Sequence, residues 1–289
     1  MKLEEKNTGV LYIVATPIGN LSDISERAII TLKDVDLIVA EDTRHSKPML
    51  DKLGVSAALL SYHRFNEAAR CDELIKRLLN GQSIALISDA GTPLISDPGY
   101  RLVRAAHHHH IAVSPIPGAC AAVAALSVCG FDSEHFYFAG FLAAKSVARC
   151  QQLQQLKSIP AMLIFYESPH RILATLQDMA KILGSHRQAL IAREITKRYE
   201  DIQRDRLTGL ITWLQQDDNH QRGEFVIIID APEFSQQQRK VSEKSQQTLE
   251  ILLEELPLKQ AVELAAKLSD AKKNDLYQLA LEMKNKSYP

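Results

Sequence analysis

The chain has 289 residues, of which 46% are hydrophobic and 24% are charged, and its formal net charge at pH 7 is −1. This length suggests about two domains, and the composition is that of an ordinary globular protein. The balanced charge argues against a freestanding nucleic-acid-coating protein, which is usually basic, but it leaves room for a local basic patch.

The cysteines and the apolar segments predict where the protein works. Cys71, Cys120, Cys129 and Cys150 form no C-x-x-C pair, which is typical of reduced thiols in a cytosolic protein. The first apolar run is too short for the core of a signal peptide. No segment approaches the roughly 20 apolar residues that span a bilayer. We therefore expect a cytoplasmic protein without a membrane partner.

Short apolar runs alternate with helical patterns along the first 230 residues or so. This alternation predicts an α/β fold of βαβ units with mostly parallel sheets. In the first half, the expected strands are 11–14, 35–40, 84–87 and 111–113, and the expected helices are 25–33, 46–53, 71–79 and 100–108. A further helix over 119–128 is apolar nearly all round, which predicts that it is buried.

The second half repeats the pattern and then changes character. The expected strands are 136–139, 161–166, 188–192 and 224–229, and the expected helices are 146–157, 170–183 and 208–215. We predict α/β domains over 10–130 and 131–231, a polar linker from Pro232, and a helical appendage over 246–289 with helices at 248–255, 259–268 and 272–283. Residues 233–289 carry nine Lys or Arg and nine Asp or Glu, so the appendage could bind nucleic acid as a helix-turn-helix or could serve packing.

Three predicted strands run into loops rich in Gly and Pro, namely ATPIGN at 15–20, DAGTPLISDPG at 89–99 and SPIPGA at 114–119. Glycine permits sharp bends and close approach of a ligand, and ligands bind at the carboxyl edge of open α/β sheets. The loops therefore indicate a ligand site, although surface turns would need the same residues.

The sequence lacks G-x-G, G-x-x-x-x-G-K-[ST], H-E-x-x-H and G-x-S-x-G. It therefore combines the expected topology of a nucleotide-binding fold with none of the usual phosphate-binding loops. His107–His110 raises the possibility of a metal site. Four consecutive residues of a helix cannot all face one ion, whereas cationic side chains suit the C-terminal end of a helix. We therefore favour the interpretation that the histidines simply end the predicted helix.

Charged residues follow several predicted strands. Glu41-Asp42-Thr43-Arg44 could assist a substrate hydroxyl or could form an ion pair at a helix N-cap. Each of three further segments has a functional and a structural interpretation. In 166–171, capping by Ser168 explains part of the pattern but not the Tyr166-Glu167 pair, and 192–197 could be a site or a solvated loop. Gly223 could permit close approach of a ligand or could end a turn. Six cations near these loops would form a phosphate-binding surface if they cluster: Lys145, Arg149, Arg171, Arg193, Lys197 and Arg198.

Seven segments, taken in this order and spacing, resemble the ribosomal RNA small-subunit methyltransferase I family of the tetrapyrrole-methylase-like (class III) methyltransferases. They are VATPIGNLSDIS, AEDTR, ISDAGTPLISDPG, PIPGACAA, FYESPHRI, AREITK and GEFV. The resemblance covers residues 10–230 and extends more loosely through LPLKQAVELAAKL and KKNDLYQLALE.

The resemblance implies an S-adenosylmethionine-dependent enzyme that methylates the ribose 2′-hydroxyl of cytidine 1402 in 16S rRNA, within the small ribosomal subunit. It also implies two α/β domains with the cofactor in the cleft between them, a homodimer, and no DNA partner. The mechanism needs no metal. A tetrapyrrole or diphthine methyltransferase of the same fold and a non-catalytic RNA-binding assembly factor are the alternatives.

The resemblance also implies roles for individual residues. The cofactor-binding set is Pro17, Gly19, Asp89, Ala90, Gly91, Thr92, Gly118, Ala119, Cys120, Tyr166, Ala192 and Gly223. Cys120 departs from the Ser or Thr that is common in the superfamily. The chemistry of a weakly acidic hydroxyl requires a base or a cation, and the candidates are Glu41, Asp42, Glu194 and Lys197. The expected substrate-binding cations are Arg44, Lys145, Arg149 and Arg171. Asp97-Pro98-Gly99 is expected to shape its loop rather than to contact the cofactor.

Overall fold

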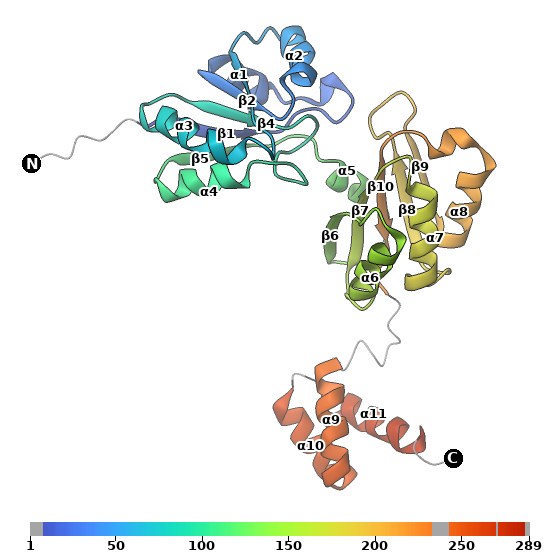
Figure 1. Cartoon of the computed structure of the whole chain (residues 1–289). Coiled ribbons are helices and arrows are strands. Elements are labelled where there is room, and N and C mark those ends of the chain that lie inside the picture. Colours follow the sequence, from blue (N-terminus) through green and yellow to red (C-terminus); the bar gives the residue numbers. More distant parts are fainter. Residues whose placement is uncertain (1–7, 233–242, 270, 287–289) are drawn as a thin grey trace, which may run out of the picture. The chain divides into compact units, whose positions relative to one another are not determined.

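The structure is a computed structural model that describes residues 8–232, 243–269 and 271–286 (Figure 1). The chain divides after Ala231 into two compact units. The first unit contains two five-stranded sheets, and the second unit is helical. Within the described residues, no helix is long and apolar enough to cross a membrane.

The first sheet has the order β3-β2-β4-β1-β5, and every pair in it is parallel, as predicted. Its strands are β1 (Val10–Val14), β2 (Leu37–Ala40), β3 (Ala58–Ser61), β4 (Ile84–Ile87) and β5 (Ala112–Ile116). β5 continues through Pro115, which an edge strand tolerates because it leaves one side of its backbone unpaired. The prediction missed β3, a four-residue edge strand in which no residue is fully buried.

Helices cover both faces of this sheet. They are α1 (Glu26–Asp34), α2 (Thr43–Lys52), α3 (Glu67–Leu79) and α4 (Tyr100–His108). α1 and α2 pack Leu32 and Leu50 on one face, and α3 and α4 pack Leu78 and Leu102 on the other. Both faces are therefore covered, which explains why β2 and β4 are buried along their whole length.

The second sheet has the order β6-β7-β10-β8-β9 and corrects the prediction of a mostly parallel sheet. Its strands are β6 (Phe136–Phe141), β7 (Met162–Glu167), β8 (Gln188–Arg193), β9 (Asp201–Arg206) and β10 (Phe225–Ile229). Only β6 and β7 are parallel, while the other three pairs are antiparallel. Because helices bury the central strands on both faces, these strands have continuous apolar runs like those of a parallel sheet.

Helices α6 (Ser146–Leu156), α7 (Ile172–Leu183) and α8 (Leu207–Gln216) pack on one face of the second sheet. The opposite face packs against α5 (Ala121–Ser127), through Ala122 and Ala125. This helix lies within the range predicted for the first domain, yet its core contacts belong to the second sheet. It is also less buried than predicted, because Val123 is 59% exposed.

The second compact unit contains α9 (Glu243–Glu255), α10 (Leu258–Leu268) and α11 (Lys273–Lys286). The three helices share a small core that includes Leu249, Val262 and Leu276. The three helices predicted for the tail are therefore present, with α9 starting five residues earlier than expected, before Thr248.

Candidate active site

A cavity of about 510 Å³ lies among the carboxyl ends of strands from both sheets of the first unit. It is lined by residues that follow β2 and β4 in the first sheet and β7 and β8 in the second, together with the start of β10. The volume is within the range of roughly 300–1,000 Å³ that is typical of small-molecule sites. The loops that the sequence singled out therefore converge on one cavity.

Two of these loops are held together by their backbones. Thr16 and Gly91 form an isolated antiparallel bridge, with N···O distances of 2.9 and 3.1 Å. Gly91 has φ of 80°, a conformation that favours glycine. Ser88 and Thr16 add side-chain hydrogen bonds to the Gly91 carbonyl, at 3.1 and 3.4 Å. These hydrogen bonds within the protein fix the position of Gly91, which lines the cavity.

The third loop joins the same assembly. The Thr92 hydroxyl donates a hydrogen bond to the Ala119 carbonyl at 3.0 Å. Gly118 lies so close to Ala15 that an added Cβ would approach the Ala15 Cβ at 2.8 Å. Opposite, the Tyr166 hydroxyl accepts a hydrogen bond from the Ala122 amide at 3.2 Å. Tyr166 therefore ties β7 to the N-terminal end of α5.

Most of the predicted cofactor-binding residues meet at this cavity. Those that line it are Asp89, Ala90, Gly91, Thr92, Cys120, Tyr166 and Ala192. Those that lie outside the lining are Pro17, Gly19, Gly118, Ala119 and Gly223. Among the second group, Gly19 and Gly223 make room for the side chains of Lys197 and Glu194, respectively, since an added Cβ would meet them. All twelve roles in cofactor binding stay predictions.

Five acidic residues line the cavity, and two of them are paired with cations, Glu167 with Arg171 and Glu224 with Lys197. The other three are Glu41 after β2, and Asp89 and Asp97 in the loop after β4. Burial, followed by the charge of Glu41, raises the pKa of Asp97 to about 6; Asp89 adds to this rise, while a hydrogen bond from Ser88 and the charge of Arg64 oppose it. Burial, followed by the charge of Asp89, also raises the pKa of Glu41. The cavity therefore combines negative charge with carboxyls that are reluctant to ionise.

Asp97, which was expected to shape its loop rather than to contact the cofactor, lines the cavity. The loop after β4 folds back on itself because Leu94 and Ser96 adopt positive φ values of 71° and 74°. The sequence does not reveal this reversal, since neither residue is Gly or Asn, the types that usually adopt such a conformation. Sequence reasoning therefore missed Asp97.

The loop after β8 contributes a cation to the cavity. The Lys197 ammonium donates to carboxylates of Glu194 and Glu224, both at 2.9 Å. Although burial lowers the pKa of Lys197, these hydrogen bonds raise it more, so the side chain stays charged. Glu194 has a φ of 51° and lies outside the lining. Its carboxylate accepts hydrogen bonds from the Lys197 ammonium and from the Glu224 amide. Of these two predicted catalytic residues, only Lys197 faces the cavity.

Asp42 and Arg44 form an ion pair at a helix N-cap, which is the second of the two roles that the sequence allowed. Asp42 is the N-cap of α2, and its carboxylate accepts hydrogen bonds from the Arg44 amide at 2.9 Å and the guanidinium at 2.8 and 3.1 Å. These contacts hold the pKa of Asp42 at about 2, so it is a poor base. Asp42 thus forms the N-cap that the sequence also allowed, and its catalytic role stays a prediction, as does substrate binding by Arg44, whose side chain is 90% exposed.

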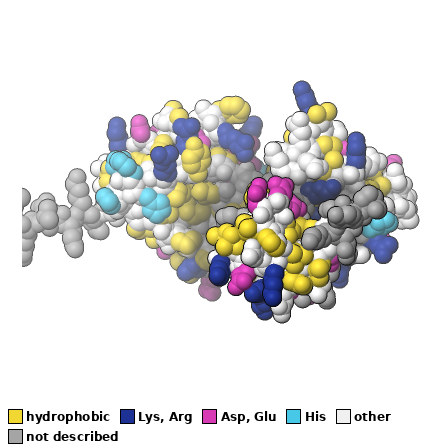
Figure 2. Space-filling view, turned by 90° about the horizontal axis from the view of Figure 1, so that it is seen from below, with side chains coloured by type: hydrophobic (Ala, Val, Ile, Leu, Met, Phe, Trp, Pro, Cys, Tyr) yellow, Lys and Arg dark blue, Asp and Glu magenta, His cyan; other side chains and the backbone are white. Residues whose placement is uncertain are grey.

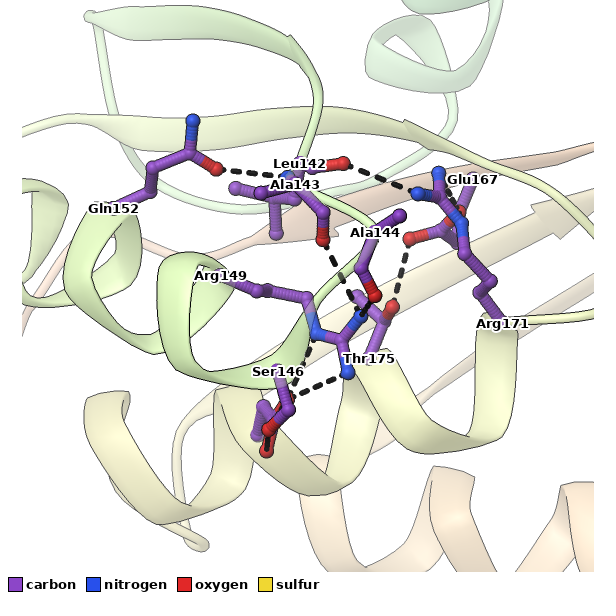
Figure 3. A network of polar contacts seen from close by, with 10 residues as sticks. Leu142, Ala143, Ala144, Ser146, Arg149, Gln152, Glu167, Arg171 and Thr175 are labelled. Atoms are coloured by element: carbon purple, nitrogen blue, oxygen red, sulfur yellow. Dashed lines mark hydrogen bonds and ion pairs between the residues drawn. The ribbon is translucent and has the colours of Figure 1, made fainter.

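Arg149 and Arg171 are engaged inside the second α/β part (Figure 3). Arg149 has a buried side chain that pairs with Asp178 at 2.7 Å and donates to two carbonyls of the 143–144 segment. Arg171 pairs with the buried Glu167 at 2.6 Å, and Thr175 donates to the same carboxylate. Substrate binding by Arg149 stays a prediction, although burial and pairing leave its guanidinium little access to a phosphate. Arg171 has its guanidinium committed to Glu167 and the Leu142 carbonyl.

Lys145 and the run of four histidines lie on the surface, whereas Arg193 is only partly exposed and donates to the carbonyls of Asn219 and Arg222. Lys145 is exposed immediately before α6. His107–His110 are exposed at the C-terminal end of α4, and Figure 2 shows His side chains near Lys and Arg side chains on the molecular surface. Within the described residues, no group of three or more His, Cys, Asp or Glu could hold a metal ion.

The comparisons with known proteins fit this geometry. A family model described as Tetrapyrrole (Corrin/Porphyrin) Methylases matches residues 10–211, and one described as RsmI C-terminal HTH domain matches residues 240–284. The chain is 50% identical to "Ribosomal RNA small subunit methyltransferase I" of Pasteurella multocida, over 95% of this chain and 98% of that protein. The chain belongs to the ribosomal RNA small subunit methyltransferase I family. The protein of the same name from Escherichia coli O157:H7 is 46% identical over 96% of each chain.

Solved structures show the same fold at low identity. Diphthine synthase superposes with a TM-score of 0.60 at 15% identity, covering 77% of this chain and 90% of that one. Uroporphyrin-III C-methyl transferase from Thermus thermophilus, complexed with S-adenyl homocysteine, gives a TM-score of 0.54 at 16% identity, covering 77% and 97%. The predicted family and α/β class are therefore confirmed, and this family member is a methyltransferase.

Proposed function

We propose that this chain transfers a methyl group from S-adenosylmethionine to the 2′-hydroxyl of cytidine 1402 in 16S rRNA of the small ribosomal subunit. The names of the relatives support the rRNA substrate, and the complex of the uroporphyrin enzyme supports the cofactor. The observation that carries the proposal is the acidic cavity where the Gly/Pro loops meet strands of the second sheet.

The residues present fit the cofactor. S-adenosylmethionine carries a sulfonium, an ammonium and one carboxylate, so its net charge is positive. The cavity presents the carboxyls of Glu41, Asp89 and Asp97, which complement that charge. Asp89 and the positive-φ Gly91 backbone would hold the methionine end, and Tyr166 and Ala192 would contact it from the second sheet. When bound, the cofactor supplies the activated methyl group.

The protein has to orient the ribose hydroxyl and to receive its proton. Glu41 is the proposed proton acceptor, because it faces the cavity and its pKa lies above that of an exposed carboxyl. Lys197 is charged and faces the same space, so it would polarise the hydroxyl and favour the developing alkoxide. Orientation by the cavity walls supplies much of the remaining rate gain.

The decisive experiment maps ribose methylation in 16S rRNA. Small subunits that lack the modification are incubated with the purified protein and S-adenosylmethionine, and 2′-O-methylation is read along the rRNA. We expect a single new methyl group at cytidine 1402 that depends on both components. Methylation of free corrins or of elongation factor instead would establish one of the other enzyme classes, and no transfer to any of them would contradict a catalytic function.

The activity should depend on pH through Asp97. Loss of its charge makes Glu41 less basic, because the two carboxyls interact. We therefore expect kcat/KM to rise with pH through an inflection near 6, the pKa of Asp97. The inflection should disappear in Asp97→Asn, as measured by initial rates between pH 5 and 8. An unshifted inflection in that variant would contradict the assignment.

The same pKa predicts a trend in stability. The folded protein holds the Asp97 proton up to a higher pH than the unfolded chain, for which 3.8 is the reference. The resulting stabilisation is complete below that reference and is lost as the pH rises to about 6. Chemical denaturation of Asp97→Asn should therefore lack this decline.

A homodimer and a cytoplasmic location are also part of the proposal. The family resemblance implies the homodimer, and a protein that acts on ribosomal subunits is expected in the cytoplasm. Sedimentation of the purified chain tests the homodimer.

A further inference from the structure

Phe65 is 98% exposed, more than any other large hydrophobic side chain among the described residues. A fully exposed phenylalanine loses the free energy of burial that this side chain normally contributes. Scattered exposed apolar residues need no explanation, but this one lies beside the proposed active site. The turn that carries Phe65 is joined by a hydrogen bond to a residue that lines the cavity.

The turn that carries Phe65 is tightly fixed. The Asn66 side chain accepts a hydrogen bond from the His63 amide at 2.8 Å and donates one to the Ser61 carbonyl at 3.0 Å. The amides of Asn66 and Glu67 both donate to the His63 carbonyl, at 3.0 and 2.9 Å. Phe65 is therefore held outward by an ordered turn at the end of β3 and the start of α3.

The same turn forms part of the rim of the cavity. Arg64 donates to the carbonyl of Ser96 at 3.0 Å, and Ser96 lines the cavity. The Ser61 hydroxyl donates to the carbonyl of Glu41, the proposed proton acceptor, at 3.3 Å. Two hydrogen bonds thus connect the turn and the end of β3 with Ser96 and Glu41, which both line the cavity.

The charge around Phe65 suggests the class of partner. Arg64 lies next to it in the turn and is exposed. Arg44 follows β2, which pairs in parallel with β3 so that Ala40 lies opposite Ser61. An aromatic ring accompanied by arginines is the combination with which proteins hold single-stranded nucleic acid, the ring stacking on a base and the guanidinium groups contacting phosphates.

We propose that Phe65 is a stacking platform for a nucleobase of single-stranded RNA beside the methylated nucleotide, with Arg64 and Arg44 binding adjacent phosphates. This inference rests on the proposed rRNA substrate and names residues that would recognise it. The carboxyls inside the cavity repel phosphate, which places the RNA backbone on the arginine side of the rim. Phe65 is almost fully accessible, and the His63 ring lies edge-on to its ring, with centroids 6.0 Å apart.

The first test separates binding from chemistry. Phe65→Ala should raise the KM for small subunits by about tenfold with little change in kcat, because base–aromatic stacking contributes to binding. Phe65→Tyr should restore the KM to within about twofold, since it keeps the ring. Phe136→Ala is the matched control, because Phe136 is a 54% exposed phenylalanine at the opposite end of β6 from Phe141, which lines the cavity. It should leave KM unchanged.

A second readout does not depend on activity. Trp213 is the single tryptophan of the chain, so Phe65→Trp combined with Trp213→Phe gives one fluorophore at the rim. Titration with a single-stranded oligocytidylate should quench its fluorescence to saturation. Phe136→Trp in the same Trp213→Phe background should show no quenching.

The outcomes distinguish this inference from the proposed function. If the wild-type chain fails to methylate small subunits, the proposed function fails, while the quenching still decides whether Phe65 stacks on RNA. An active wild type with an unchanged KM in Phe65→Ala would overturn the inference. So would an absence of quenching at position 65.

Discussion

Glu41→Gln is expected to lower kcat for methyl transfer by about 10²–10⁴-fold, the range typical of losing a general base. The amide keeps the size and shape of the side chain but cannot accept a proton at neutral pH. Binding of S-adenosylmethionine, measured by calorimetry, should weaken far less than kcat falls, because Asp89, Asp97, the Gly91 loop and Tyr166 are untouched. Single-turnover rates on unmethylated small subunits provide the measurement.

Asp42→Asn is the matched control for this variant. It makes the same chemical change one residue later, and Asn is as good an N-cap as Asp, so α2 keeps its cap. We expect its kcat to stay within about threefold of the wild type. If Asp42→Asn loses activity while Glu41→Gln keeps it, the proton acceptor is not Glu41.

The second large effect is expected on stability. Asp178→Ala should reduce the free energy of unfolding by about 3–5 kcal/mol, because it leaves the Arg149 guanidinium buried without its partner. The Arg149 side chain is only 4% exposed, and two backbone carbonyls cannot replace the lost charge. Urea denaturation monitored by circular dichroism gives the value, provided that m is unchanged.

Two variants control for this result. Asp51→Ala removes the exposed Lys47–Asp51 ion pair and should cost less than about 1 kcal/mol. Asp178→Leu combined with Arg149→Met replaces both charges by apolar groups and should recover much of the loss. A change below about 1 kcal/mol in Asp178→Ala would show that the pair is not important for stability.

The predicted substrate-binding cations differ in burial, which limits what a pattern of charged residues can predict. Arg149 and Arg44 are the same residue type beside predicted loops, yet one is buried and the other is exposed. Their difference depends on Asp178, which lies 29 residues after Arg149 and was not part of any motif. Both arginines pair with a carboxylate, so a guanidinium near a loop is available to a phosphate only when its side chain stays exposed, as that of Arg44 does.

The sequence by itself determined the α/β class, the family, most helices and the loops that line the cavity. Those features depend on local patterns, namely apolar periodicity and Gly/Pro loops after buried runs. The tertiary structure decided which carboxyls face the cavity, because the reversal at Leu94 and Ser96 brings Asp97 toward Glu41, 56 positions earlier in the chain.

The tertiary structure also decided which strands pair in the second sheet and in which direction they run. β9 consists of DIQRDR, an edge strand without apolar alternation, and its pairing depends on hydrogen bonds to β8. β10 inserts antiparallel between β7 and β8, which an unbroken apolar run does not reveal. Strand direction and partner are set by backbone contacts between distant segments, and no local pattern of side chains encodes them.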